Sequence, residues 1–336
     1  MDNGARQTHS APVASPWVRV IIVNFNGGAF LRSALAGLAV QTMGNFEAVI
    51  VDNASTDGSL ESLELPDARF RIIRSESNIG FAAGANLGVQ DARTPWIAML
   101  NPDATPQPQW LEKLHAATDR HAGFALFGST QLMAETPLML DGAGDNYSVF
   151  GMAWRGGYGS SAANVDKDIE VFSLCAAAAL YRRDVFTAAG GFAESFFCYL
   201  EDVDLCFRLR LQGHRAMLVA DARVIHVGSA IAGTSTFAYY YTARNGIWLL
   251  ARCMPWQLLI LVAPLHLASQ AWLILRRHHW QARIAGIKEG LRTVHTQWPA
   301  RRRLQGRGRL PVFQLCRMLA WSPRAISQRR IVPLNN

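Results

Sequence analysis

The chain has 336 residues, of which half are hydrophobic and 17% are charged, so it can fill one large or two smaller cores and is not a wholly polar chain. Its net charge of +8 is uneven: residues 276–336 hold thirteen Arg and one Lys against one acid, whereas residues 1–275 hold 19 basic and 24 acidic residues. The basic tail therefore indicates an anionic partner, either a membrane surface or nucleic acid.

Residues 1–16 are polar, contain Pro and Ser, and have no apolar run of the kind found in signal peptides. We expect them to be a disordered lead-in to a cytosolic body. The cysteines agree with this compartment, because they show neither CxxC nor metal-ligand spacing and so favour buried thiols over a disulfide framework. They are Cys175, Cys198, Cys206, Cys253 and Cys316.

Strands and helices are predicted to alternate through the first third of the chain. Continuous apolar runs predict buried strands at 18–24, 46–52, 70–73 and 95–100. Helical spacing and glycine punctuation predict helices over 29–41, shortly after 58, and within 78–92. This alternation is typical of a parallel sheet covered by helices, so the fold class is α/β.

The middle of the chain is less regular. Residues 138–168 are rich in Gly, Ser, Asn and Tyr, as expected of loops over a site. A short helix is predicted over 183–189, and a longer one over about 202–212, with acids in its first turn and Gly213 at its end.

The run from Trp256 to Leu275 is strongly apolar and is followed at once by Arg276 and Arg277. Twenty residues are about enough for a membrane-spanning helix, although Pro264 and three polar residues weaken that reading. An interfacial or re-entrant helix fits equally well, and a buried core helix is the remaining alternative. The adjacent basic residues favour contact with an anionic membrane.

Polar residues follow the predicted strands at the edge where open α/β sheets bind ligands. The loop after residue 23 has neither GxGxxG nor a P-loop pattern, so a dinucleotide or P-loop site has little support. Asn101-Pro102-Asp103 ends another strand, and one carboxylate can suffice for a divalent cation when phosphates supply other ligands. Pro102 would stiffen the loop that presents Asp103. Taken alone, the tripeptide equally fits a simple turn.

Three further features could carry chemistry. Asp52 could accept the N3–H of uracil or thymine, or form a turn with the next residue. Glu201, Asp202 and Asp204 follow aromatic residues, so their pKa values could be raised enough for base catalysis, or they could simply favour a helix N-terminus. His226 ends an apolar run and could be an ordinary core residue or a ligand.

The order of these segments resembles glycosyltransferase family 2, the inverting sugar-nucleotide enzymes of GT-A fold. The resemblance covers about residues 17–250. Its motifs are VNFNGG (23–28), VDNASTDGS (51–59), NIGFAAGANLG (78–88), LNPDATP (100–106), GGFAESFFCYLEDVDLCFRLRLQG (190–213) and HVGS (226–229). NPD in place of a DxD metal motif, together with the GGF and EDVDLC segments, looks like the bacterial rhamnosyltransferase branch. Ala193 departs from the family, which commonly has Asp at that position.

The resemblance implies roles for individual residues. The base would be held by Val23, Phe25 and Asp52, and the diphosphate would face Asn101 and Asp103. Mg²⁺ or Mn²⁺ would be bound by Asp103 and His226. Asp202 would be the general base, with Glu201 and Asp204 as supporting acids. Trp96 and the Arg244-Asn245 pair also belong to the pattern, without an assigned role.

The expected architecture is a GT-A domain over 17–250, with a Rossmann-like, mostly parallel sheet and flanking helices. Residues 17–106 would form its nucleotide-binding half and 107–250 its acceptor half, followed by an apolar helix and basic helical tail over 251–336. The tail would hold the enzyme at the cytoplasmic face of the inner membrane, near a glycan or polyprenyl-linked acceptor.

The expected reaction transfers a deoxysugar, foremost L-rhamnose from dTDP-rhamnose, to a lipid-linked or cell-envelope glycan. A UDP-hexose or galactofuranose is the alternative donor, because uracil and thymine present the same N3–H to Asp52. A non-catalytic, membrane-associated scaffold is an alternative of another class. The basic tail could also bind nucleic acid without specificity, but no nucleic-acid motif accompanies it.

Overall fold

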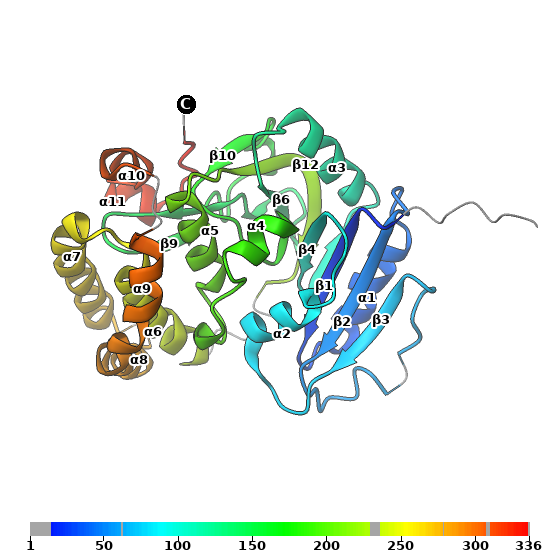
Figure 1. Cartoon of the computed structure of the whole chain (residues 1–336), viewed down its shortest axis with the longest axis horizontal. Coiled ribbons are helices and arrows are strands. Elements are labelled where there is room, and N and C mark those ends of the chain that lie inside the picture. Colours follow the sequence, from blue (N-terminus) through cyan, green and yellow to red (C-terminus); the bar gives the residue numbers. More distant parts are fainter. Residues whose placement is uncertain (1–14, 62, 229–235, 278, 307–309, 335–336) are drawn as a thin grey trace, which may run out of the picture.

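The computed structural model describes residues 15–61, 63–228, 236–277, 279–306 and 310–334 (Figure 1). Within these ranges, ten strands form one mixed sheet and two more form a separate hairpin. The predicted lead-in, 1–16, lies outside the described residues except for its last two.

The first half of the sheet is parallel. Its order is β4 (Trp96–Leu100), β1 (Val18–Asn24), β2 (Phe46–Asp52) and β3 (Phe70–Arg74), which confirms the predicted strands. All seven residues of β1 are buried, which explains its continuous apolar run. Since β2 and β4 flank β1 on opposite sides, the carboxyl ends of β1 and β4 form a switch point, where such sheets bind ligands.

The second half of the sheet mixes directions. Beyond β4 come β11 (Ala178–Arg182), β6 (Leu126–Met133), β12 (Ala216–His226) and β10 (Ile169–Val171). Two short strands join this half, β5 (Ala104–Pro106) on β12 and β7 (Leu140–Gly142) on β6. The antiparallel pairing of β5 with β12 sets His226 opposite Ala104. It thereby brings the end of β12 to the NPD turn.

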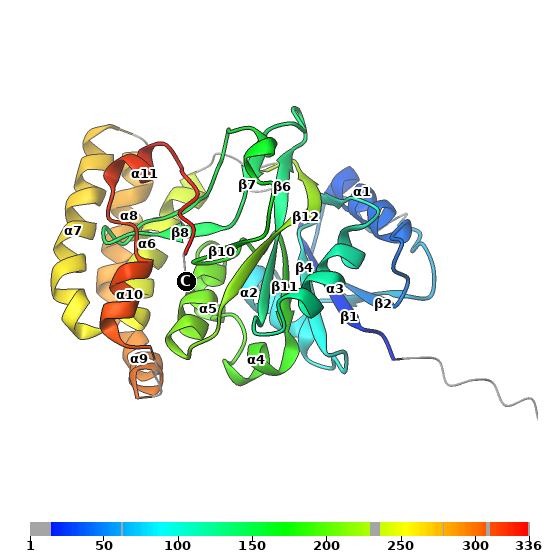
Figure 2. The same ribbon diagram turned by 90° about the horizontal axis from the view of Figure 1, so that it is seen from above.

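Helices cover both faces of the sheet (Figures 1 and 2). One core lies under α1 (Gly28–Ala39) and α3 (Trp110–Arg120), and the other under α2 (Gly80–Val89), α4 (Arg183–Ala188) and α5 (Glu201–Leu211). The glycines of α2 allow it to lie very close to β1, because a Cβ at Gly84 would come within 2.8 Å of the Val23 side chain. The predicted glycine-rich helix is therefore confirmed, with a packing reason for its composition.

The short helix predicted after residue 58 is wrong. Residues 53–61 and 63–69 contain turns and no helix. Backbone N–H groups in and beside this segment donate to side-chain oxygens instead. Thr56 N donates to Asn26 Oδ1 (2.8 Å), and the Asp57 carboxylate accepts from Gly28 N (2.9 Å) and Ser59 N (3.0 Å). Such bonds compete with helix formation.

The region 138–168 contains more regular structure than the predicted loops. In addition to β7, it holds a hairpin of β8 (Asp145–Tyr147) with β9 (Ala153–Arg155), and a 3₁₀ turn over Ala162–Asn164. All three residues of β8 are buried. This segment is therefore part of the folded body and not a surface covering.

The remaining helices form a third layer against the outer side of α5 (Figure 1). They are α6 (Thr236–Cys253), α7 (Trp256–Leu275), α8 (Trp280–Thr293), α9 (Trp298–Gln305), α10 (Val312–Met318) and α11 (Pro323–Ser327). Val203, Phe207 and Leu211 of α5 share one hydrophobic cluster with this layer. The chain then returns to the body, where Leu334 N donates to Glu170 O at 2.9 Å. The helical region is thus packed on the body that contains the sheet and is not attached as a loose tail.

Candidate active site

The Asn101-Pro102-Asp103 tripeptide forms a fixed turn at the end of β4. Asn101 N donates to Ala177 O (2.8 Å), and Ala104 N donates back to Asn101 O (3.0 Å). These bonds hold both ends of the turn, and Asp103 is only 7% exposed. The tripeptide is a turn and at the same time presents its carboxylate at the switch point.

The structure brings His226 to Asp103. His226 Nε2 lies 3.3 Å from Asp103 Oδ1, and His226 Nδ1 lies 2.7 Å from Asp141 Oδ2. Asp141, which the sequence did not single out, also forms an ion pair with Arg155. Burial opposes a charge on the imidazole, but the neighbouring carboxylates of Asp103 and Asp141 outweigh it and raise the pKa of His226.

Asp103 and His226 fit a divalent cation. The buried His226 Nε2 has no well-aligned hydrogen-bond partner, so its lone pair can be directed to a metal beside the Asp103 carboxylate. Asp141 holds the opposite ring nitrogen, as carboxylates commonly do behind metal-binding histidines. A carboxylate, an imidazole and the oxygens of a diphosphate are a donor set that suits Mg²⁺ or Mn²⁺.

A cavity of about 350 Å³ opens beside this turn, and its size suits a small ligand. Of the residues predicted to bind the donor, it is lined by Val23, Phe25, Asn101 and Asp103. Asp52 is not among the lining residues: it is buried and accepts from Ser55 N (3.1 Å), whereas its neighbour Asn53 does line the cavity.

Asp202 lines a second cavity of about 240 Å³, which shares Asn101, Arg155 and Tyr199 with the first. Two backbone groups orient its carboxylate, Ala176 N at 3.1 Å and its neighbour Val203 N at 2.8 Å. Burial raises the pKa of Asp202 despite these bonds. A carboxylate beside the donor cavity with a raised pKa is suited to act as a general base.

The segment before α5 is held in an unusual conformation. Phe197, Tyr199 and Leu200 all have φ near +65°, a region that non-glycine residues rarely occupy. Asn245 Nδ2 stabilises this segment by donating to three of its backbone carbonyl oxygens, those of Phe196, Cys198 and Tyr199, the last at 2.7 Å. Arg244 donates to Phe196 O at 2.9 Å. The Arg244-Asn245 pair, which had no role from sequence, therefore fixes the turn that presents Asp202.

The other two acids of the EDVD segment, Glu201 and Asp204, have different surroundings. Glu201 is 5% exposed, and burial together with the charge of Asp202 raises its pKa well above the ordinary value. Asp204 is not brought to the site: it pairs with Arg208 of the same helix (2.7 Å) and with Arg252 of α6 in the helical layer (2.8 Å). Asp204 is thus a structural ion-pair partner.

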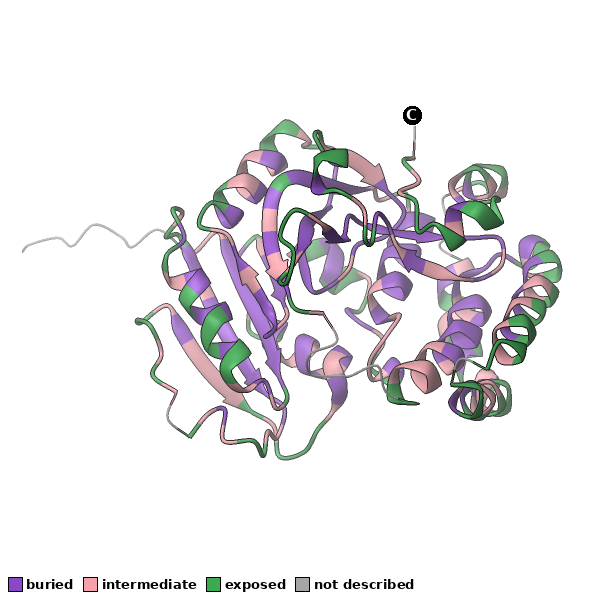
Figure 3. Cartoon of the chain, turned by 180° about the vertical axis from the view of Figure 1, so that it is seen from behind, coloured by how far each residue is buried: buried purple, intermediate pink, exposed green. Residues whose placement is uncertain are grey.

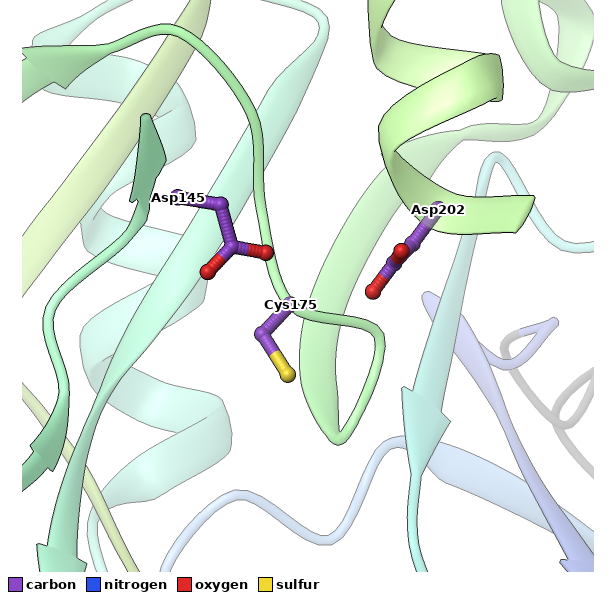
Figure 4. Close-up of side chains that lie close together, drawn as sticks. All are labelled: Asp145, Cys175 and Asp202. Carbon is purple, nitrogen blue, oxygen red and sulfur yellow. The ribbon is translucent and has the colours of Figure 1, made fainter. Parts of the chain in front are cut away.

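Sequence reasoning missed Asp141, Asp145 and Arg155. Asp141 belongs to β7, whereas Asp145 and Arg155 face each other across the β8–β9 hairpin. Figure 4 shows Asp145 directed toward Asp202, with Cys175 beside them. Arg155 lines both cavities and also a third, beside His226. The only sequence signal was an acid-and-glycine pattern within a region assigned to loops.

Known proteins match both the sequence and the fold. The family model described as Glycosyl transferase family 2 matches residues 19–189. N-acetylglucosaminyl-diphospho-decaprenol L-rhamnosyltransferase of Mycobacterium tuberculosis is 26% identical over 270 residues, covering 68% of this chain and 85% of that protein. The predicted resemblance to rhamnosyltransferases is thereby confirmed.

Two solved structures share the fold. A mannosyltransferase from Pyrobaculum calidifontis, solved with GDP-Man and Mn²⁺, has a TM-score of 0.53 at 16% identity and covers 91% of this chain and 85% of its own. GalNAc-T7, solved with UDP, GalNAc and Mn²⁺, has a TM-score of 0.58 at 16% identity and covers 71% of this chain and 48% of its own. The predicted GT-A fold is confirmed.

Proposed function

Since the chain belongs to glycosyl transferase family 2 and is a glycosyltransferase, we propose that it transfers L-rhamnose from dTDP-rhamnose to a hydroxyl of a lipid-linked or cell-envelope glycan. The donor and acceptor are inferred from the rhamnosyltransferase relative, whose match extends over most of both chains. The alternative of a non-catalytic scaffold is not retained, because the family is catalytic and Asp103, Asp202 and His226 converge on adjoining cavities.

The single observation that carries the proposal is the junction of the two cavities. The larger holds the NPD turn and His226, the smaller holds Asp202, and Asn101, Arg155 and Tyr199 border both. A nucleotide sugar in the larger cavity would therefore place its sugar between the metal-binding residues and the base. This is the geometry that a direct displacement needs.

The reaction follows from these positions. Asp202 takes the proton of the acceptor hydroxyl as that oxygen bonds to the anomeric carbon and the carbon–phosphate-oxygen bond breaks, which inverts the centre. A divalent cation held by Asp103 and His226 would neutralise charge on the departing diphosphate. Asn101 would hold the donor without adding negative charge beside the diphosphate, and Asp141 keeps the His226 ring oriented.

The donor is tested by incubating the purified protein with a panel of sugar nucleotides, with and without Mg²⁺ or Mn²⁺, and measuring release of nucleotide diphosphate. We expect metal-dependent turnover of dTDP-rhamnose, enhanced by acceptor and absent in Asp202→Asn. Preference for a UDP-sugar would overturn the rhamnosyl assignment. Failure of every sugar nucleotide both to bind and to turn over would overturn the proposed reaction.

Membrane contact through α7 is part of the proposal. Among the described helices, α7 alone is long and apolar enough to cross a membrane by length and composition, which by itself is weak evidence for a span. Two of its polar residues face the rest of the protein instead: His266 Nδ1 lies 3.2 Å from Phe150 O, and Gln270 accepts from Arg283 of α8 at 3.3 Å, whereas Gln257 in the first turn is exposed. A helix packed along its length on a folded body suits an in-plane position.

Figure 3 shows that much of the outer side of α7 is exposed. This side suits the surface of an anionic inner leaflet. Its exposed residues include six that are large and apolar: Trp256, Ile260, Leu261, Leu267, Trp272 and Leu275. The Arg276 guanidinium lies 4.1 Å from the Trp272 ring, so a cation accompanies an aromatic residue at the end of the helix. Such pairs anchor helices at membrane interfaces.

A further inference from the structure

A buried carboxylate that the proposed reaction does not use lies opposite the base. One oxygen of Asp145, the Sγ of Cys175 and one oxygen of Asp202 lie within 4.8 Å of one another (Figure 4). Asp145 reaches this position from β8, whose backbone is fixed by reciprocal bonds with Ser173 at 2.8 and 3.0 Å. The side chain is thus aimed by the hairpin into the cavity that Asp202 lines.

Asp145 lacks the partners that a buried carboxylate normally has. It is 6% exposed, and its Oδ1 makes no hydrogen bond. Leaving such a group unpaired costs stability, so its retention in a cavity points to a ligand that supplies a hydrogen-bond donor. The nearby carboxylate of Asp141 differs from Asp145 in this respect, because Asp141 is paired with both Arg155 and His226.

The ligand that fits this cluster is neutral and rich in hydroxyl groups. The Arg155 guanidinium borders the same cavity and can donate hydrogen bonds to a ligand there. Burial raises the pKa of Cys175 to about 12, so its thiol is uncharged at neutral pH. Sugar hydroxyls can donate to carboxylates and accept from an arginine, so they suit both charged groups of the cavity.

The rest of the cavity suits one sugar ring. Its walls include the aromatic residues Phe81, Trp154 and Tyr199, and aromatic walls with a few fixed polar groups are typical of small-ligand sites. Its volume of about 240 Å³ is below the roughly 300–1,000 Å³ of sites for larger, drug-sized ligands. Trp154 Nε1 donates to Arg330 O at 3.0 Å, so the returning C-terminal segment holds one wall in place.

We propose that Asp145 and Arg155 form the acceptor-sugar subsite, in which Asp145 binds a hydroxyl adjacent to the one that Asp202 deprotonates. The subsite thereby selects acceptors with two neighbouring free hydroxyls. This inference rests on the proposed function, because it takes Asp202 as the base. It adds a residue that touches the acceptor and decides which sugar is accepted.

The test compares Asp145→Asn with the unaltered protein, using octyl glycosides of common hexoses and N-acetylhexosamines and their monodeoxy analogues as acceptor probes. For the glycoside that the unaltered protein glycosylates best, and in assays above pH 8 where Asp145 is ionised, we expect the substitution to raise the acceptor KM about tenfold or more, the loss of one charge-assisted hydrogen bond. Donor affinity should stay unchanged. Removing the adjacent hydroxyl from the acceptor should raise the KM of the unaltered protein to that of the variant. The same removal should leave the KM of the variant unchanged.

A second measurement separates binding from a structural role. Because Asp145 has an unpaired oxygen, Asp145→Asn should keep or raise the Tm, whereas loss of a structural carboxylate would lower it. Asp221→Asn, an exposed carboxylate on β12, is the matched control and should change neither quantity. An unchanged acceptor KM with intact donor turnover would overturn this inference alone. Absence of donor binding and turnover in the unaltered protein would instead overturn the proposed function.

Discussion

His226 Nδ1 lies 2.7 Å from Asp141 Oδ2, while the opposite ring nitrogen faces Asp103 at 3.3 Å. Asp141 therefore fixes the ring so that Nε2 is directed at the proposed metal position. We expect Asp141→Asn to weaken Mn²⁺ binding about 10–100-fold, the usual effect of removing a carboxylate behind a metal-binding histidine. The Mn²⁺ affinity of each protein is measured by titrating Mn²⁺ and following the binding of the donor.

The control for that experiment is Asp221→Asn, which removes an exposed carboxylate from the strand that carries His226. It should leave Mn²⁺ affinity unchanged. Native Mn²⁺ affinity in Asp141→Asn would show that the ring does not depend on Asp141, and would count against His226 as a ligand.

Asp202 and Glu201 can be distinguished as bases. Asp202→Asn should bind the donor normally but lose transfer by roughly 10²–10⁴-fold, the range for loss of a general base. Glu201→Gln should remain active, because burial and the charge of Asp202 raise the pKa of Glu201 well above its ordinary value, which favours the neutral carboxyl that Gln resembles. Single-turnover transfer rates of the two variants, at saturating donor, decide between them. The reverse pattern would assign the base to Glu201.

The sequence predicted the parallel half of the sheet well, because strands buried on both faces have continuous apolar runs, as in β1 and β2. Family motifs pointed to Asp103 and Asp202, and the structure places both at adjoining cavities, while their roles stay predictions. The sequence could not predict Asp145 and Arg155, since only the pairing of β8 with β9 brings them to the cavity. Asp204 illustrates the opposite case. Its motif suggested a supporting acid, although the i,i+4 spacing to Arg208 was a signal for a helix ion pair.

Asp204 should matter for stability rather than chemistry. Its carboxylate is fully buried between Arg208 and Arg252, and the two cations hold its pKa below the ordinary value against the effect of burial. Asp204→Asn leaves both cations underpaired, so we expect a loss of about 3–5 kcal/mol in the free energy of unfolding. Urea unfolding gives this value.

The matched control is Asp184→Asn, which breaks an exposed pair with Arg182. Exposed pairs contribute about 0–1 kcal/mol, so this variant should be nearly as stable as the unaltered protein. Equal, small effects of the two substitutions would mean that Asp204 does not join α5 to the helical layer.

The stability of the protein should depend on pH through Asp145. Burial and the charge of Asp202 raise the pKa of Asp145 from 3.8 to about 8. Between the unfolded pKa of about 4 and the folded pKa of about 8, the folded state holds a proton that the unfolded state has lost. The free energy of unfolding therefore decreases as the pH increases over this range. The Tm advantage of Asp145→Asn should therefore grow over this range and vanish at its lower end. A difference that stays constant with pH would contradict the shifted pKa.

Attachment to membranes should depend on the outer side of α7. Ile260 and Leu275 are 71% and 80% exposed there, so introducing charge at these positions leaves the core intact but opposes insertion among lipid headgroups and acyl chains. We expect the double variant Ile260→Glu and Leu275→Glu to bind anionic vesicles at least about tenfold more weakly, while its Tm and its turnover of a soluble acceptor stay native. Sedimentation with vesicles of phosphatidylglycerol and phosphatidylethanolamine measures the binding.

Leu138→Glu provides the control, because Leu138 is 82% exposed in a loop remote in sequence from α7 and the substitution adds the same kind of charge. Its vesicle binding should remain native, apart from a small change due to the added charge. Truncation of the chain within α6 would be a poorer experiment, since α5 buries Val203, Phe207 and Leu211 against the helical layer and would be exposed. If the α7 double variant still sediments fully with vesicles at physiological salt, the helix is not the membrane-binding surface. If high salt alone releases the unaltered protein, basic side chains rather than apolar contact hold it to the membrane.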